Sequence, residues 1–244
     1  MSITLGARVF RSFDRPSAEL VRLFEGIPSS NIGDIANRLF CTNGDLHALN
    51  DRPLLGTAYT VKVPAGDNLM IHLALDLAQE GDILVIDGAG ATERSLFGEM
   101  MLLYAQKKGL GGIVIDGAVR DLDFCRRAEI PVYAKAATPQ GPYKNGPGEI
   151  NVPVCCAGQV VFPGDILVGD TDGIVVVHPE QAPELAKLAR AKMEGETAQR
   201  GTTADGSYLP EHEASFLAQA QGKGVVFSDE AYRRPAYREA EGKA

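Results

Sequence analysis

The stretch "GGIVIDGAVRDLDF", from Gly111 to Phe124, joins an apolar run to a group of charged side chains. Residues 113–115 are Ile-Val-Ile, a β-branched run that is typical of a strand covered on both faces. Arg120, Asp121 and Asp123 follow shortly after this run. The stretch therefore predicts a buried strand that ends in a cationic fork flanked by carboxylates.

Two other stretches of the chain have the same form. "EGDILVIDGAG" at residues 80–90 and "PGDILVGDTDG" at residues 163–173 each carry an apolar run that ends in Asp and Gly. Proteins that alternate strands and helices bind their ligands beyond the carboxyl ends of the strands. The three stretches thus predict several strand ends that meet at acidic, glycine-rich turns.

The segments around these stretches predict the fold class. Helical periodicity favours helices at residues 67–79 and 98–108, on either side of a strand at 83–86. Residues 138–148 are rich in Gly and Pro and predict a surface loop, whereas residues 151–178 alternate short apolar runs with turns. We expect a single α/β domain in which a mixed sheet layer lies beside an antiparallel layer.

Composition excludes several classes of protein. The chain has 244 residues, 45% of them hydrophobic, and a formal net charge of −8. It has no Lys/Arg-rich run, so we expect no nucleic-acid partner. It has no run of 18 apolar residues and no signal-peptide pattern, so we expect a cytoplasmic protein without a membrane partner. The four cysteines form no CxxC pair, which favours free thiols.

Arg120 and Asp121 are the first candidate site. The guanidinium group is a planar, permanently charged fork that suits a carboxylate or an enolate oxygen. A carboxylate can bind a hard divalent cation, and one carboxylate with several waters is a normal arrangement for Mg²⁺. The alternative is a local Arg–Asp ion pair that caps the helix predicted to follow.

The start of the helix at Gly98, Glu99, Met100 and Met101 is the second candidate site. The first backbone N–H groups of a helix have no partner within the helix, and the helix dipole is positive at that end. A substrate carboxylate can therefore bind there without a basic side chain. The alternative is an ordinary helix start in which Glu99 is favourable in the first turn.

Other patterns are weaker. Gly88-x-Gly90 lacks the third glycine of a dinucleotide-binding loop, so a nucleotide site is not favoured. Lys62 and Lys135 lie in strand-like segments, where each could form a Schiff base if buried or could face solvent. The histidines have no zinc-site spacing; they are His47, His72, His178 and His212.

The motifs "FGEMM" and "GGIVIDGAVRD" closely resemble those of the class II pyruvate aldolases that cleave 4-hydroxy-4-methyl-2-oxoglutarate and 4-carboxy-4-hydroxy-2-oxoadipate. The same family includes the regulator of ribonuclease E activity A. The resemblance extends from about Ser30 to Gly201 and implies a swivelling β/β/α fold in trimers or hexamers, with sites between subunits. It implies an aldolase-like domain at residues 1–201 and a C-terminal extension at residues 202–244, which we expect to pack on a neighbouring subunit.

The resemblance also implies a Mg²⁺ or Mn²⁺ cofactor and a role for each matched residue. Asp121 would be the direct metal ligand and Glu99 would reach the metal through water. Arg120 and the backbone of residues 98–101 would bind the substrate, and Glu196 or Glu194 of a neighbouring subunit would lie near the site. This sequence departs from the family pattern at Asp123, which follows the Arg-Asp pair sooner than expected, and in its longer C-terminal tail.

The implied activity is divalent-metal-dependent aldol cleavage of a 4-hydroxy-2-oxo acid. It releases pyruvate through a metal-stabilised enolate and belongs to the breakdown of aromatic compounds. Because loss of CO₂ from oxaloacetate produces the same enolate, oxaloacetate decarboxylation is a natural second activity. Two alternatives remain open: a regulatory protein that binds an RNA-degrading enzyme with little catalysis, and a lyase for a different 2-oxo acid.

Overall fold

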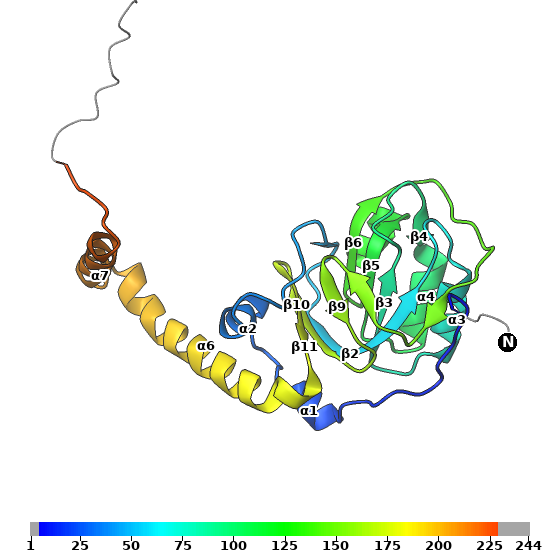
Figure 1. Ribbon diagram of the computed structural model, residues 1–244, viewed down its shortest axis with the longest axis horizontal. Helices are drawn as coiled ribbons and strands as arrows, with labels where there is room; N and C mark the ends of the chain where they lie inside the picture. Colours follow the sequence, from blue (N-terminus) through cyan, green and yellow to red (C-terminus); the bar gives the residue numbers. More distant parts are fainter. Residues whose placement is uncertain (1–4, 229–244) are drawn as a thin grey trace, which may run out of the picture. The chain divides into compact units, whose positions relative to one another are not determined.

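The computed structural model describes residues 5–228 (Figure 1). The chain divides into two compact units with the boundary after Gly195, and the strands of the described residues all belong to the first unit. Among the helices of the described residues, none has the length and apolar character needed to cross a membrane.

Four parallel strands form the centre of a nine-stranded sheet. In spatial order they are β6 (Val132–Ala137), β5 (Gly112–Val119), β3 (Asp82–Asp87) and β2 (Leu54–Lys62). Every residue of β3 and β5 is buried, as the apolar run at residues 113–115 predicts. β5 is longer than that run because it continues through a register irregularity to Val119.

Antiparallel strands extend this sheet beyond β2. β10 (Ile166–Asp170) pairs with β2, and β11 (Gly173–Val177) pairs with β10. The hairpin of β8 (Val154–Cys156) and β9 (Gln159–Val161) forms a separate, two-stranded sheet. The parallel and antiparallel parts are thus largely continuous in one mixed sheet. Three short strands complete the sheet: β1 (His47–Ala48), β4 (Ser95–Phe97) and β7 (Glu149–Ile150).

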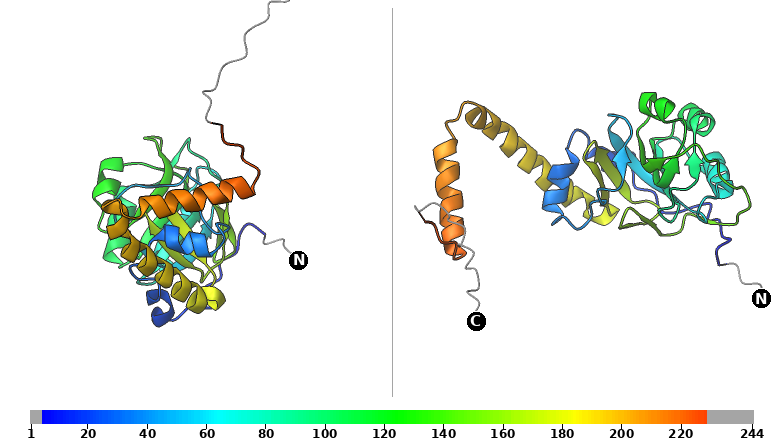
Figure 2. Two further views of the ribbon diagram at one scale, coloured as in Figure 1. Left: turned by 90° about the vertical axis from the view of Figure 1, so that its left-hand side faces the viewer. Right: turned by 90° about the horizontal axis from the view of Figure 1, so that it is seen from above.

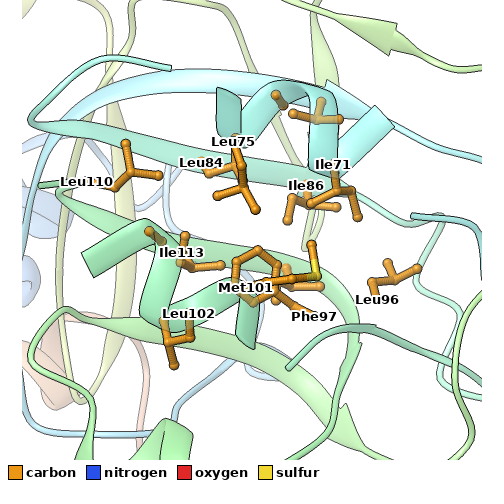
Figure 3. Close-up of a cluster of buried hydrophobic side chains, with 14 of the residues drawn as sticks. Ile71, Leu75, Leu84, Ile86, Leu96, Phe97, Met101, Leu102, Leu110 and Ile113 are labelled. Carbon is orange, nitrogen blue, oxygen red and sulfur yellow. The ribbon is translucent and has the colours of Figure 1, made fainter. Parts of the chain in front are cut away.

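Helices cover one face of the central strands. α3 (Leu69–Leu77) and α4 (Glu99–Lys107) pack there, and Figure 3 shows their side chains against those of β3 and β5. Burial of such apolar side chains is the main driving force that holds helices to a sheet. The labelled core residues are Ile71, Leu75, Leu84, Ile86, Leu96, Phe97, Met101, Leu102, Leu110 and Ile113.

The other face of the sheet packs against the β8–β9 hairpin. Val85, Val114 and Tyr133 share a buried cluster there with Cys156, whereas Cys155 is exposed. Adjacent residues of a strand point to opposite faces, which explains the difference between the two cysteines. The four cysteines are free, as expected from their spacing.

Five further helices complete the described structure. They are α1 (Ala18–Arg22), α2 (Ser29–Ile35), α5 (Leu122–Arg127), α6 (Ala182–Ala204) and α7 (Leu209–Gly222), with a 3₁₀ turn at Pro179–Gln181 before α6. One of them, α5, adds Cys125 to the cluster that α3 and α4 form with the sheet. α6 and α7 are successive helices, drawn in yellow to orange in Figure 2. The second unit therefore contains the end of α6 and all of α7.

Candidate active site

The short strand β4 brings the two candidate motifs together. Phe97 of β4 is paired with Val119 of β5, and the backbone N–H of Arg120 donates to the carbonyl oxygen of Phe97 at 2.9 Å. α4 begins directly after β4, and α5 begins directly after Asp121. The start of α4 at Gly98 and the Arg-Asp pair therefore lie side by side, although they are more than twenty residues apart in the sequence.

Asp121 is turned toward α4 rather than toward its own helix. Its Oδ2 accepts a hydrogen bond from the backbone N–H of Glu99 at 2.9 Å and lies 3.6 Å from Nε of Arg120. Asp121 occupies the N-cap position of α5, but its side chain makes no capping hydrogen bond. The Arg–Asp ion pair is therefore present, and the alternative that it caps the following helix is wrong.

The backbone of Asp121 is also unusual. Its φ angle is +56°, in the left-handed region that non-glycine residues rarely adopt. Such a conformation costs on the order of 1–3 kcal/mol and is found most often at functional sites. The turn positions the carboxylate beside the first N–H group of α4, because a continuing strand would carry it away from that group.

Gly98 makes this close approach sterically feasible. A Cβ atom at this position would lie 2.7 Å from Oδ2 of Asp121 and 3.0 Å from Cγ of Arg120. Its φ of −155° is extended backbone that any residue adopts, so the requirement for glycine here concerns space and not conformation. Any side chain at Gly98 would displace Asp121 or Arg120.

A cavity of about 330 Å³ opens beside this pair. Among its lining residues within the described part of the chain, Arg120 and Lys144 are charged and none is a carboxylate. In a chain with a net charge of −8, these two side chains make a local positive charge that suits an anionic ligand. The other lining residues are Asn68, His72, Ser95, Leu96, Phe97, Gly98, Met100, Met101, Gly141 and Pro142.

The loop of residues 138–148 forms one wall of the cavity. Nη1 of Arg94 donates to the carbonyl oxygen of Gly141 at 2.8 Å, and Nη2 donates to the hydroxyl of Tyr143 at 2.8 Å. The guanidinium group also lies 4.0 Å from the centre of the Tyr143 ring. The sequence predicts a surface loop here, but Gly and Pro content alone does not indicate that the loop is fixed against a cavity.

Asn68 and His72 are wall residues that the sequence analysis missed. Nδ2 of Asn68 donates to the carbonyl oxygen of Leu96 at 3.1 Å, whereas Oδ1 of Asn68 and Nε2 of His72 are buried without a hydrogen-bond partner. Burial lowers the pKa of His72, and the positive charge of Lys144 lowers it further. Their i, i+4 spacing places both residues on one side of the helix, but it does not indicate that this side faces a cavity.

The remaining predicted residues lie in varied environments. Glu99 is exposed, and so is Met100, whereas Met101 is buried in the core. Asp123 pairs with Arg126 at 3.7 Å, and its side chain is 86% exposed, so it belongs to the solvent face of α5. Glu194 and Glu196 are exposed residues of α6 on either side of the unit boundary.

The two lysines considered for a Schiff base are paired with carboxylates. Nζ of Lys135 lies 2.7 Å from Oδ1 of Asp116, and Nζ of Lys62 lies 3.3 Å from Oδ2 of Asp87. The bond to Asp116 raises the pKa of Lys135. A Schiff-base lysine needs its neutral form, so this environment opposes that chemistry at Lys135.

The donor set near Arg120 fits a magnesium-type cation and not a zinc-type one. Among residues 5–228, no group of three or more His, Cys, Asp or Glu side chains could hold a metal ion. Asp121 offers one carboxylate whose side chain is 41% exposed. Mg²⁺ commonly keeps several waters and binds through one or two carboxylates plus substrate oxygens, and Mn²⁺ accepts the same oxygen ligands.

Known proteins match both the sequence and the fold. A protein of Halalkalibacterium halodurans named "Putative 4-hydroxy-4-methyl-2-oxoglutarate aldolase" is 33% identical over 188 residues, which cover 77% of this chain and 90% of that protein. A Thermus thermophilus protein named "4-hydroxy-4-methyl-2-oxoglutarate aldolase" is 37% identical over 111 residues, covering 46% and 68% of the two chains.

The solved structure of Streptomyces coelicolor RraAS2 superposes with a TM-score of 0.69 and 28% identity, covering 78% of this chain and 99% of that chain. It is described as an unusual member of the RNase ES inhibitor RraA protein family. The family model RraA-like, described as "Aldolase/RraA", matches residues 29–176, more than half of the chain. With this match, the paired motifs and the mixed sheet, the chain belongs to the RraA-like family.

Proposed function

We propose that this protein cleaves a 4-hydroxy-2-oxo acid of the 4-hydroxy-4-methyl-2-oxoglutarate type, releases pyruvate and depends on Mg²⁺ or Mn²⁺. The observation that carries the proposal is the contact of Asp121 with Arg120 and with the start of α4, beside a cavity that Arg120 and Gly98 line. The names of the aldolases to which this chain is similar agree with it.

In this proposal, Arg120 and the first turn of α4 bind the substrate. A 2-oxo acid carries a carboxylate and an adjacent carbonyl oxygen. The N–H groups of Met100 and Met101 in the first turn of α4 would hold the carboxylate. The Arg120 guanidinium lines the same cavity and would donate to the 2-oxo oxygen, where negative charge grows as the C3–C4 bond breaks and the enolate forms. Binding is therefore strongest when the charge on that oxygen is greatest, which is the requirement for catalysis.

Asp121 would hold the divalent cation directly, and Glu99 would reach it through water. A cation bound there would act as a Lewis acid toward the developing enolate charge. Asp121 can serve because, within residues 5–228, the Glu99 N–H group and Arg120 both contact the same oxygen of its carboxylate, Oδ2. Glu196 from a neighbouring copy is proposed as a further outer ligand, on the resemblance alone.

The test uses matched carboxylate variants. Asp121→Asn keeps the size of the side chain but removes its charge, and we expect at least about a 10²-fold loss of pyruvate release, since one charge-stabilising group contributes that much. Asp123→Asn is the control, because Asp123 faces solvent two residues away. Pyruvate is measured from 4-hydroxy-4-methyl-2-oxoglutarate and from oxaloacetate, with Mg²⁺ and after EDTA treatment. Undiminished turnover by Asp121→Asn in EDTA would refute the proposal.

A second candidate is a regulatory protein that binds an RNA-degrading enzyme and has little catalysis. It is supported by the likeness to RraAS2, a member of an RNase ES inhibitor family. The same assay separates the two functions, because a purely regulatory protein releases no pyruvate with or without Mg²⁺. Assays with a panel of other 4-hydroxy-2-oxo acids test whether the protein is instead a lyase for a different substrate.

A further inference from the structure

Lys144 is a charged residue of the cavity wall to which the proposed function gives no role. Lys144 and Arg120 line the same cavity of about 330 Å³. The guanidinium group of Arg120 lies near Asp121, whereas among residues 5–228 the ammonium group of Lys144 forms no ion pair. The charge of Lys144 acts on the cavity wall, because it lowers the pKa of His72 beyond the lowering that burial causes. The cavity therefore offers a second positive charge to a ligand.

The loop holds the backbone of Lys144 in place from both sides. Before it, the N–H of Tyr143 donates to the carbonyl oxygen of Gly66 at 2.8 Å, and the carbonyl oxygen of Tyr143 accepts from the N–H of Asn68 at 3.0 Å. After it, the carboxylate of Asp67 accepts from the next two backbone N–H groups of the loop, at 2.6 and 3.0 Å. Unpaired lysines are common on protein surfaces, but this one is fixed at a cavity between two anchored neighbours. Such an arrangement lowers the entropy that a ligand must remove on binding.

A second carboxylate on the substrate is the ligand that suits this charge. The proposed substrate, an oxoglutarate, carries carboxylates at C1 and C5. In the proposed function the C1 carboxylate binds the first turn of α4 and the 2-oxo oxygen binds Arg120, so the C5 carboxylate has no partner. An ammonium group is a compact positive charge with three hydrogen-bond donors. Building on the proposed function, we propose that Lys144 binds the C5 carboxylate and selects dicarboxylic over monocarboxylic 2-oxo acids.

The charge of the C5 carboxylate does not change during cleavage, because this group leaves intact with the departing carbonyl product. Lys144 thus binds the substrate and the transition state equally well. An interaction of that kind lowers KM and leaves kcat almost unchanged. Arg120, in contrast, would contact the oxygen on which charge develops. The two cations of the cavity are therefore distinguished by which kinetic constant each one controls.

The experiment compares two substrates that differ only in the distal group. They are 4-hydroxy-4-methyl-2-oxoglutarate and 4-hydroxy-4-methyl-2-oxopentanoate, in which a methyl group replaces the C5 carboxylate. We expect Lys144→Gln to raise KM for the diacid by about 10-fold, with kcat within a few-fold, and to leave both constants for the monoacid unchanged. This factor is the lower end of what a hydrogen bond to a charged group contributes, because Lys144 is exposed.

Two further variants separate charge from structure. Lys144→Arg keeps the positive charge and should keep most of the preference for the diacid. Lys107→Gln is the matched control, because Lys107 is an exposed lysine of α4 that does not line the cavity. It should match the unsubstituted protein with both substrates. Unchanged monoacid kinetics of Lys144→Gln also show that this variant folds.

Calorimetry measures the same contact without turnover. The ligands 2-oxoglutarate and 2-oxopentanoate have no hydroxyl group on C4 and cannot undergo the cleavage. In the presence of Mg²⁺, Lys144→Gln should raise Kd for 2-oxoglutarate by about 10-fold and leave Kd for 2-oxopentanoate unchanged.

The outcomes separate this inference from the proposed function. Equal increases of KM for the diacid and the monoacid would place the action of Lys144 at the end of the substrate that they share, or in the fold. That result, or an unchanged KM for the diacid, would overturn the inference while the proposed function stands. Failure of the unsubstituted protein to release pyruvate from either hydroxy acid with Mg²⁺ would overturn the proposed function itself.

Discussion

Gly98 illustrates how one residue without a side chain sets the geometry of a site. A methyl group there would meet Oδ2 of Asp121 at 2.7 Å and Cγ of Arg120 at 3.0 Å, so both groups would have to move. Displacement of catalytic groups by about 1 Å can reduce rates by about 10²-fold. We therefore expect Gly98→Ala to lower kcat for pyruvate release by about that factor.

The control for this prediction is Gly44→Ala, since a Cβ at Gly44 would meet no atom within 4 Å. Steady-state kinetics and circular dichroism of both variants separate a local displacement from loss of the fold. Full activity of Gly98→Ala would show that the close approach of Asp121 to the start of α4 is not needed for turnover.

At the scale of elements, four neighbouring parallel strands carry a row of charges. Lys62 of β2 is in register with Asp87 of β3, and Asp87 is in register with Asp116 of β5. Lys135 of β6 completes the row through its ion pair with Asp116 at 2.7 Å. The charges run positive, negative, negative, positive, so each outer lysine neutralises one of the two central, mostly buried aspartates, whose charge would be costly to bury without a cation.

Removal of Lys135 is predicted to destabilise the sheet. Breaking a buried ion pair lowers the free energy of unfolding by about 3–5 kcal/mol. Because the Lys135 side chain is 19% exposed, we expect Lys135→Met to lose an amount near the lower limit of that range. Urea unfolding at pH 7 measures the loss. Lys62→Met should cost at most about 1 kcal/mol, since Lys62 is 54% exposed. Equal losses of unfolding free energy in Lys135→Met and Lys62→Met would contradict the assignment of Lys135 to a stabilising buried ion pair.

The pH dependence of this pair has a defined sign. Asp116 raises the pKa of Lys135 in the folded state, so its stabilising contribution is fully present below the unfolded lysine pKa of about 10.4. It is lost as pH rises through the higher folded value. The difference in unfolding free energy between the unsubstituted protein and Lys135→Met should therefore be constant near pH 7 and shrink above about pH 10.

At the scale of the whole molecule, the helices beside the cavity carry an apolar surface. The exposed side chains on α3 and α4 are Leu69, Leu73, Met100, Leu103 and Tyr104, with exposures of 40–76%. Surfaces of this kind commonly mark protein–protein contacts. Together with the trimers or hexamers that the family resemblance implies, this favours a second copy of the chain as the partner of this surface.

We expect the protein to sediment as an oligomer and Leu103→Glu to shift it toward the monomer, because a buried unpaired charge in an interface is costly. The measurement is analytical ultracentrifugation over a concentration series. Leu39→Glu is the control, since Leu39 is 68% exposed and lies outside α3 and α4. A monomeric unsubstituted protein would contradict the expectation.

The local chemistry of the sequence anticipates much of the fold. The β-branched run at residues 113–115 lies in the buried β5, and the helix predicted at 98–108 closely matches α4. Both predictions rest on local patterns of apolar residues and helix caps, and these patterns depend on neighbours along the chain. The position of Asn68 and His72 in a cavity wall could not be predicted, because it depends on how α3 packs across the sheet and on the loop that carries Lys144.

By itself, the sequence determined the buried runs of β3 and β5, the start of α4 and the presence of Arg120 and Asp121, whose groups suit an anion and a cation. The turn expected at Asp116 and Gly117 is wrong, because both residues lie inside β5. Only the tertiary structure decided what Asp121 does with its carboxylate. Its side chain bonds Glu99 of another helix, 22 residues away, and not the helix that it begins. The reason is physical: a local pattern specifies which groups are available, whereas the pairing of β4 with β5 specifies which of them meet.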